Sequence, residues 1–133
     1  MTDPAYEWRG RFADPELNRL HAECFDHPLL ADAWWQQVNR FSLGWVCARS
    51  GGTLAGFVNV AWDGGVHAFL LDTMVTATLR RKGCATRLVA EAIRGARATG
   101  CEWLHVDFEP HLDELYLGAC GFRRTDAGLI ALR

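Results

Sequence analysis

A strand followed by a loop and a helix is the feature that most constrains the fold of this chain. Residues 67–76 form a nearly continuous apolar run, the pattern of a central strand buried on both faces. Residues 85–98 carry apolar side chains every three to four positions and end before Gly100, which indicates an amphipathic helix. A strand that leads into such a helix requires a sheet and a covering layer, so we expect an α/β protein.

The flanking segments predict the other elements of a mixed sheet. Asp14 is predicted as an N-cap with Pro15 at the first helical position, and two helices are expected first. Hairpin strands follow, and the chain ends with a strand, a short helix and one or two closing strands. The predicted order is α-α-β-β-β-α-β-α-β, with antiparallel hairpins and one parallel crossover. The bounds are 14–25 and 30–40 for the helices, 45–48 and 54–61 for the hairpin, and 101–108, 112–119 and 123–132 for the last elements.

Length and composition narrow the class of protein. The 133 residues suit a single domain spanning positions 1–133, with half of them apolar and a net charge of −2 that gives no basic surface for nucleic acid. No stretch reaches the roughly 20 apolar residues of a membrane span. Five cysteines without C-x-x-C pairs indicate free thiols in a reducing compartment, which favours the cytoplasm. The five histidines lack metal-ligand spacing, so no metal site is expected.

The loop between the apolar strand and the helix has the chemistry of an anion site. Unpaired backbone N–H groups at a helix start, together with the helix dipole, attract phosphate. Gly83 lacks a Cβ, Ala85 keeps the approach narrow, and Thr86 adds a hydroxyl donor. Positive charge is supplied by Arg80, Arg81 and Lys82. The alternative is a turn glycine beside a solvated basic helix entry, because a lone glycine motif is a weak signal.

Two motifs resemble the GNAT superfamily of acyl-CoA-dependent N-acetyltransferases. The stretch Val75-x-Ala77-x-x-Arg80-x-x-Gly83-x-Ala85 is similar to the family's acetyl-CoA signature, V-x-P-x-x-[QR]-x-x-G-x-[GA], with alanine in place of proline. The stretch 115–122 is similar to the family's L-Y-x-x-x-G-F, with one extra residue between Tyr116 and Gly121. The resemblance covers residues 45–132 and implies a GNAT-type fold with a splayed mixed sheet.

The resemblance also implies how acetyl-CoA binds. Backbone N–H groups from Arg81 through Cys84 to Thr86 would hold the pyrophosphate, and the pantetheine arm would run beside Met74 and Val75. Glu109 stands where the family usually has an asparagine that contacts pantetheine, so that hydrogen bond is in doubt.

Two side chains are candidates for acid–base catalysis. The tyrosine matching Tyr116 commonly protonates the departing CoA thiolate in the family, and a phenol is a neutral donor at pH 7. Asp72 is the leading candidate to take the amine proton, because a lone Asp in an apolar strand is costly unless it is paired or functional. The alternative for Asp72 is a structural role at a strand bulge. A water molecule is the other candidate base.

Cys84 lies at a helix start beside basic residues, a setting that lowers a thiol pKa. Direct attack by an amine needs no covalent intermediate, so we predict a small loop residue there rather than a nucleophile.

The resemblance thus predicts acetyl transfer from acetyl-CoA to a primary amine in a ternary complex. The acceptor stays open between a small molecule and a peptide, and homodimers, common among relatives, stay open too. The alternative function is a non-catalytic acyl-CoA-binding module with a regulatory or interaction role.

Overall fold

The computed structural model describes residues 3–133, which fold around one five-stranded sheet. Neighbouring strands in the sheet follow chain order, and the first four are antiparallel to their neighbours. The last pair, β4 and β5, is parallel, so the predicted mixed sheet is confirmed. The strands are β1 (Ala5–Trp8), β2 (Ser42–Ser50), β3 (Thr53–Trp62), β4 (His67–Val75) and β5 (Trp103–His105).

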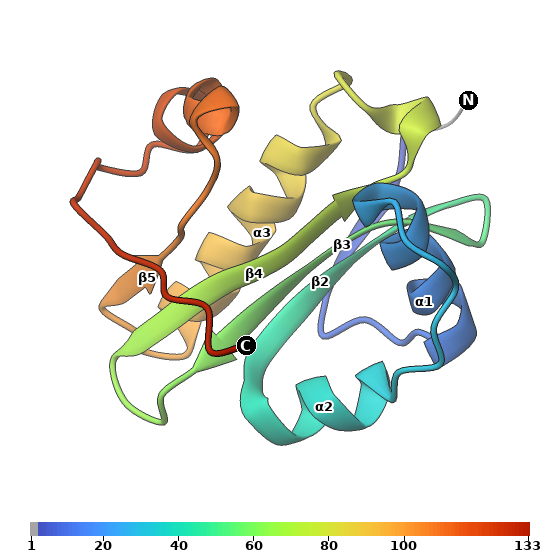
Figure 1. Cartoon of the computed structure of the whole chain (residues 1–133), viewed down its shortest axis with the longest axis horizontal. Coiled ribbons are helices and arrows are strands. Elements are labelled where there is room, and N and C mark those ends of the chain that lie inside the picture. Colours follow the sequence, from blue (N-terminus) through green and yellow to red (C-terminus); the bar gives the residue numbers. More distant parts are fainter. Residues whose placement is uncertain (1–2) are drawn as a thin grey trace.

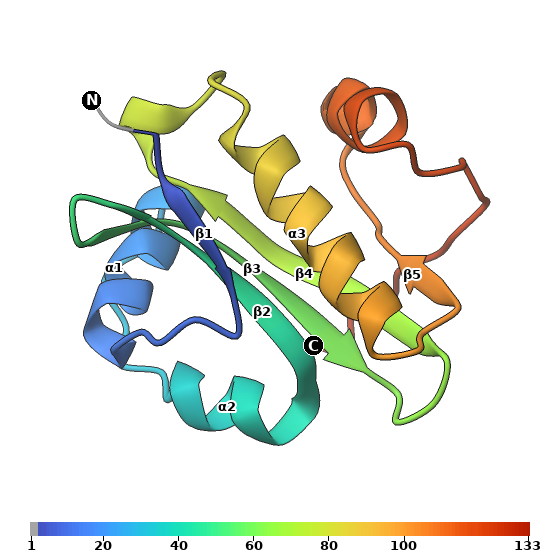
Figure 2. The same ribbon diagram turned by 180° about the vertical axis from the view of Figure 1, so that it is seen from behind.

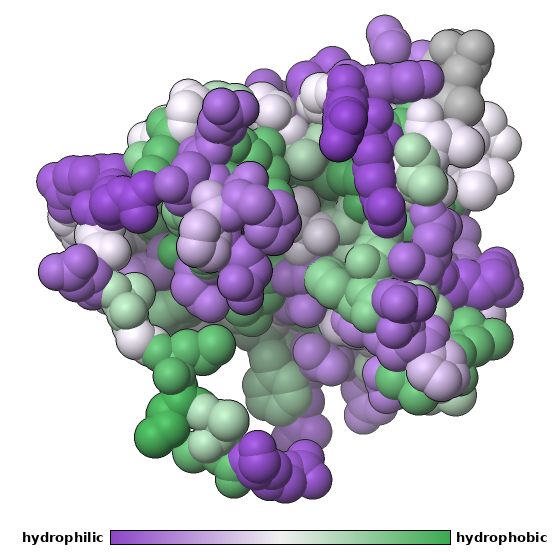
Figure 3. All heavy atoms as spheres, turned by 45° about the horizontal axis from the view of Figure 1, so that its top comes forward, coloured by the Kyte–Doolittle hydropathy of each residue, from purple (hydrophilic) through white to green (hydrophobic). Residues whose placement is uncertain are grey.

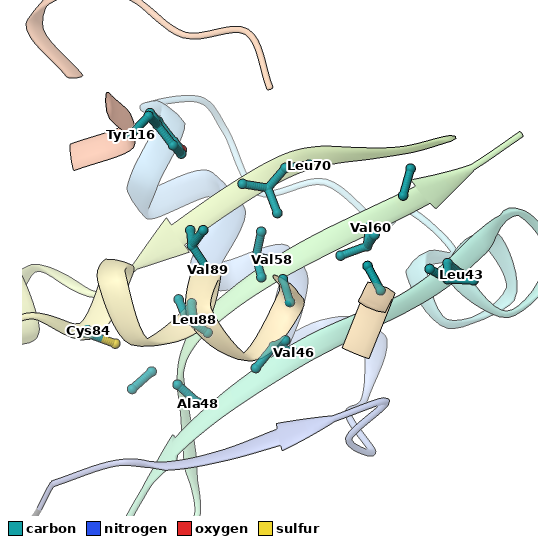
Figure 4. Close-up of a cluster of buried hydrophobic side chains, with 14 of the residues drawn as sticks. Leu43, Val46, Ala48, Val58, Val60, Leu70, Cys84, Leu88, Val89 and Tyr116 are labelled. Atoms are coloured by element: carbon teal, nitrogen blue, oxygen red, sulfur yellow. The ribbon is translucent and has the colours of Figure 1, made fainter. Parts of the chain in front are cut away.

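Three helices cover the two faces of the sheet. Helices α1 (Asp14–Phe25) and α2 (Trp34–Phe41) lie on one face, and α3 (Cys84–Ala98) lies on the other (Figures 1 and 2). Side chains alternate along β2: Val46 packs under α3, whereas Trp45 packs under α1 and α2. The sheet therefore separates two buried clusters, and Figure 4 shows the one in which α3 meets the sheet.

The sheet opens between β4 and β5. Only residues 67–69 of β4 pair with 103–105, whereas β4 continues to Val75. Beyond β5 the chain leaves the sheet and turns into a short helical segment that stands apart from the end of β4 (Figure 1). This opening is the splay expected from the resemblance.

A bulge lies in β4 just before its end. Pairing with β3 shifts register between Phe57 and Asn59, where β4 carries one extra residue. Asp72 takes up this extra length with a left-handed backbone, at a φ of 58°. A bulge bends and twists its strand, which helps β4 to diverge from β5 beyond residue 69.

Several sequence-based boundaries were wrong. Strand β1 was not predicted, because four residues are too few to show a period and the strand depends on pairing with β2. Helix α2 begins at Trp34 rather than residue 30. Strand β4 is not buried on both faces. Phe69 and Leu71, on the face opposite α3, are 38% and 41% exposed because α1 and α2 do not extend over this part of the strand.

The C-terminal part differs most from the prediction. Strand β5 has three residues, and the predicted helix 112–119 is a 3-10 turn, Pro110–Leu112, followed by a π-helix, Glu114–Ala119. The closing strands over 123–132 are absent from the described chain, because no neighbouring strand pairs with this segment. Its apolar side chains are exposed.

Candidate active site

Asp72 is half-buried at the bulge in β4, close to the opening of the sheet. The side-chain amide of Asn59 donates a hydrogen bond to Asp72 Oδ2 at 3.4 Å. Burial raises the pKa of the Asp72 carboxyl, while Asn59 and His21 oppose that rise. The structure fits both hypotheses for Asp72. The residue is at a bulge, as a structural role requires, and its carboxylate is more basic than an exposed one, as a general base requires.

Tyr116 reaches β4 from the other side of the opening. Its phenol O–H donates a hydrogen bond to Thr73 Oγ1 at 3.2 Å, one residue beyond Asp72. The ring stacks on Phe108 with centroids 4.9 Å apart and packs edge-on against Phe122. Burial raises the pKa of Tyr116, so the phenol stays protonated at neutral pH. The Tyr116 hydroxyl is therefore bonded to the residue that follows Asp72 in β4.

The extra residue after Tyr116 is accommodated by the π-helix. The N–H of Cys120 donates to Leu115 O at 2.8 Å, a bond across five residues, and the N–H of Phe122 donates to Tyr116 O at 2.9 Å. A π turn holds one residue more than an α turn, so an insertion can be absorbed without turning the Tyr116 ring away from β4.

The loop from β4 to α3 presents free backbone donors. Gly83 precedes the helix with a φ of 82°, and no side chain in residues 3–133 caps this end. The N–H of Arg87 donates to Gly83 O at 3.1 Å, which leaves the N–H groups of Cys84, Ala85 and Thr86 ahead of the first turn. This is the geometry that binds an anionic group.

The basic residues of the loop are not equivalent. Arg80 Nε donates to Val75 O at 3.1 Å, so this side chain is turned back to the end of β4. Arg81 and Lys82 are exposed in the loop, and Arg81 has a left-handed φ of 63°. Positive charge beside the helix start is supplied by these two residues rather than by all three.

Cys84 points into the core under α3 and is 3% exposed (Figure 4). Burial raises the pKa of its thiol, so the expected lowering by the helix start was wrong. A buried, protonated thiol is no nucleophile, in agreement with the prediction of a structural loop residue.

The remaining predicted contacts lie at the ends of β4 and β5. The Met74 side chain is buried with α1 and α2, so only its backbone is available to a ligand. Val75 is half-buried at the opening. Glu109 is exposed, and its carbonyl accepts the Leu112 N–H at 2.9 Å. Contacts of these residues with pantetheine stay predictions.

Helix α1 contributes contacts that the sequence did not reveal. The Glu23 carboxylate accepts the Ala77 N–H at 2.8 Å and the Thr76 hydroxyl at 3.2 Å, and the Cys24 thiol donates to Val75 O at 3.4 Å. These contacts fix the start of the loop to the last turn of α1. More than 50 residues separate the partners along the chain, so no local pattern could have indicated them.

The surface is hollowed at this end of the molecule (Figure 3). A hollow of about 510 Å³ lies beside the start of α3 and is lined by Lys82, Gly83, Thr86, Arg87 and Tyr6. Asp72 and Tyr116 are not in its lining, because it lies on the β1 side of the helix start. The loop therefore faces open space on that side as well as the opening between β4 and β5.

Comparison with known proteins identifies a family. The model of the acetyltransferase (GNAT) family matches residues 5–122. No curated protein matches the chain significantly.

Solved structures share the fold at low sequence identity. A GNAT family acetyltransferase from Streptococcus pneumoniae is 16% identical, with 98% of each chain covered and a TM-score of 0.76. An aminoglycoside acetyltransferase in complex with a bisubstrate analogue of CoA and acetylneamine is 19% identical, with 99% of each chain covered and a TM-score of 0.76. Glucosamine-6-phosphate N-acetyltransferase from Arabidopsis thaliana is 10% identical, with 96% of this chain and 97% of that one covered and a TM-score of 0.75.

Proposed function

The chain belongs to the GNAT family of acetyltransferases, and we propose that residues 1–133 form one N-acetyltransferase domain. It transfers an acetyl group from acetyl-CoA to a primary amine by direct attack in a ternary complex. The observation that supports this proposal is the hydrogen bond of the buried Tyr116 phenol to Thr73, the residue after Asp72 in β4, at the opening of the sheet.

The residues of the loop fit the anionic part of acetyl-CoA. Backbone N–H groups of Cys84, Ala85 and Thr86 would hold the pyrophosphate, and Arg81 and Lys82 would add positive charge. Gly83 supports this because it is in the left-handed region, and a Cβ built there would meet no atom within 4 Å, so the approach is open. When bound, acetyl-CoA supplies a thioester whose carbonyl backbone N–H groups near Met74 or Val75 would polarise.

Acid–base roles follow from the burial of two side chains. Asp72, or a water beside it, takes a proton from the acceptor amine, and its raised pKa makes it a better base than an exposed carboxylate. Tyr116 gives a proton to the departing sulfur, and its own raised pKa keeps that proton available at neutral pH.

A non-catalytic acyl-CoA-binding module is the second candidate. Glu109 at the position of the usual asparagine favours it, because a carboxylate cannot donate a hydrogen bond to pantetheine. Release of free thiol from acetyl-CoA with pooled polyamines, amino acids and peptides separates an enzyme from such a module.

We also propose a class of acceptor and a cellular compartment. A small-molecule amine is supported by the aminoglycoside acetyltransferase of similar fold, and a peptide amine stays the alternative. All five cysteines are free, which supports a reducing compartment such as the cytoplasm. No helix within residues 3–133 is long and apolar enough to cross a membrane.

Calorimetric titration with acetyl-CoA tests the donor site. We expect micromolar affinity for acetyl-CoA and for desulfo-CoA, and none for adenosine, because the pyrophosphate is the group that the loop binds. Gly83→Glu should abolish binding by placing a charged side chain in the loop, whereas the matched control Gly128→Glu, in an exposed segment, should bind normally. Binding that survives Gly83→Glu would remove the loop from the site.

A further inference from the structure

A chain of hydrogen bonds links two histidines to a backbone carbonyl beside the candidate site. His21 Nδ1 and His27 Nε2 are 2.6 Å apart, and His27 Nδ1 is 2.7 Å from Pro28 O. His27 returns to His21 because Asp26, with a left-handed φ of 51°, ends α1 in a tight turn. The two imidazole rings and the carbonyl therefore form one continuous line.

The carbonyl at the end of this line determines where each proton lies. A carbonyl only accepts, so His27 Nδ1 must carry a hydrogen. Neutral His27 then has its lone pair on Nε2, and the hydrogen between the rings belongs to His21 Nδ1. His21 is left with an unprotonated Nε2, so the basic atom of the line is at the end away from Pro28.

The line can accept one proton without breaking. A proton added to His21 Nε2 leaves both hydrogen bonds intact, because His21 Nδ1 still donates and His27 Nε2 still accepts. A proton added to His27 Nε2 would place two N–H donors face to face and remove the bond between the rings. Proton uptake is therefore directed to His21.

Hydrogen bonds of Glu23 and Cys24 hold α1 along the end of β4, and His21 lies one turn earlier in α1. Cys24 donates to Val75 O, three residues beyond Asp72 in β4. His21 and Asp72 interact electrostatically, each favouring the charged form of the other. Asp32, from the loop before α2, is the other carboxylate that acts electrostatically on His21.

The surroundings keep His21 neutral until a proton arrives. Burial, and secondly the neighbouring His27, lower its pKa, while Asp72 and Asp32 oppose this shift. Trp34 packs 5.3 Å from the ring, centroid to centroid, and its indole N–H is fixed by Asn18 Oδ1 at 3.2 Å. The imidazole is therefore both held in place and unprotonated at neutral pH.

We propose that the ammonium group of the acceptor binds between the Asp72 carboxylate and His21 Nε2, and that His21 takes its proton. Both groups are acceptors in this state, so they cannot bond to each other, whereas an ammonium group donates to both. The proton moves from the acceptor nitrogen to His21 Nε2, which leaves a neutral amine with a free lone pair and an imidazolium beside Asp72. This inference rests on the proposed function and changes one role in it: Asp72 binds the ammonium group as a carboxylate, and His21, rather than Asp72, takes the proton.

Nitrogen NMR of histidine-labelled protein tests the arrangement without an acceptor. We expect the Nδ1–H tautomer for both His21 and His27 at pH 8, and a single protonation at His21 as the pH falls. Asp72→Asn should move the titration of His21 down by about one pH unit, because a facing negative charge is lost. The control is His105→Gln, which breaks the other histidine pair, 2.7 Å apart and exposed, and should leave His21 unchanged. An Nε2–H tautomer at His21, or no shift in Asp72→Asn, would overturn the proposal.

Kinetics with acetyl-CoA and neamine as the probe amine test the role in turnover. His21→Gln should lower kcat about 100-fold and remove the acid limb of the pH profile, with the KM for acetyl-CoA nearly unchanged. His27→Gln, which spares the basic atom but removes the line, should lower kcat less and restore the Nε2–H tautomer at His21. An acid limb that persists in His21→Gln contradicts the proposal. Failure of the proposed function would give a different result: wild-type protein would not bind acetyl-CoA in the calorimetric titration.

Discussion

Left-handed backbone at non-glycine residues is concentrated around the candidate site. Four such residues occur in the described chain, and three of them shape this region. Asp26 turns His27 back onto α1, Asp72 forms the bulge in β4, and Arg81 lies in the loop before α3. Each conformation costs roughly 1 kcal/mol or more for a residue with a Cβ, and such strain persists where surrounding contacts determine it. The site is therefore built on backbone that the rest of the fold must hold.

Loss of the Tyr116 hydroxyl should separate catalysis from binding. Tyr116→Phe keeps the ring against Phe108 but removes the proton donor, so turnover should fall about 100-fold with the acetyl-CoA affinity unchanged. Thiol release and calorimetry measure the two effects. Phe41→Leu is the control, since Phe41 is exposed at the end of α2, away from the loop and from Tyr116. Unchanged turnover in Tyr116→Phe would exclude it as the general acid.

The ion pair of Glu16 with Arg49 should make stability depend on pH. Arg49 donates to both carboxylate oxygens of Glu16, at 3.0 and 2.6 Å, and lowers its pKa. A lowered folded-state pKa stabilises the protein above the unfolded value near 4.5, and this contribution is lost as the pH falls through the folded value.

Glu16→Gln should therefore lower the free energy of unfolding by about 1 kcal/mol at pH 7, with a difference from wild type that shrinks between pH 5 and pH 3. Urea denaturation at each pH measures it. Asp113→Asn, which breaks an exposed pair with Arg124, should have little effect at any pH. A constant difference across this range would mean that the charge of Glu16 is not what stabilises the fold.

At the scale of elements, the Trp8 side chain holds β1 against β2 and α3. The Trp8 indole lies between β2 and α3. Gly44 in β2 and Gly95 in α3 have no Cβ and leave room for the ring. A Cβ built at either glycine would overlap the indole. These two glycines are therefore needed for close packing rather than for backbone freedom.

Gly95→Ala should destabilise the protein although alanine favours a helix. Helix propensity alone would stabilise α3 by about 1 kcal/mol. Overlap with Trp8 should outweigh this and lower the free energy of unfolding by about 1–3 kcal/mol. Chemical denaturation measures the sign, and adding Trp8→Leu should recover part of the loss. A more stable Gly95→Ala would show that Trp8 moves aside without cost.

Elements with strong local signals were predictable from the sequence, and elements that depend on partners were not. The end of α1 at Phe25 was predicted correctly, and Pro15 and Glu16 mark its first turn, but the N-cap is Ala13 rather than the predicted Asp14. In contrast, β1 exists only by pairing with β2, and the segment after Phe122 has β-forming residues but no strand to pair with. Propensity proposes a strand, and tertiary contacts decide whether it forms.

The candidate site divides along the same line. Gly83 and Tyr116 followed from motifs, and the structure bonds the Tyr116 hydroxyl to Thr73, the neighbour of Asp72 in β4. Glu23 and His21 were missed, because their partners are about 50 residues away and only the packing of α1 on β4 brings them together.

At the scale of the whole molecule, β4 divides the proposed site between two layers. Helix α1 supplies the groups on the acceptor side of Asp72, and the segment with Tyr116 closes the opposite side, next to the start of α3. Strand β4 therefore lies between the residues that we propose for the acceptor and those that we propose for the acetyl donor. Movement of β4 relative to either layer would disturb attack geometry as well as binding, so the core around β4 should determine activity and stability together.

The C-terminal segment should contribute little to either property. Leu129, Ile130 and Leu132 are 81–92% exposed, so their removal exposes almost no buried apolar surface. A variant that ends at Asp126 should keep its free energy of unfolding within about 0.5 kcal/mol and bind acetyl-CoA normally. Leu88→Ala, in the fully buried face of α3, should cost about 2–5 kcal/mol in the same denaturation experiment. A truncated protein as unstable as Leu88→Ala would mean that this segment packs against the sheet in solution.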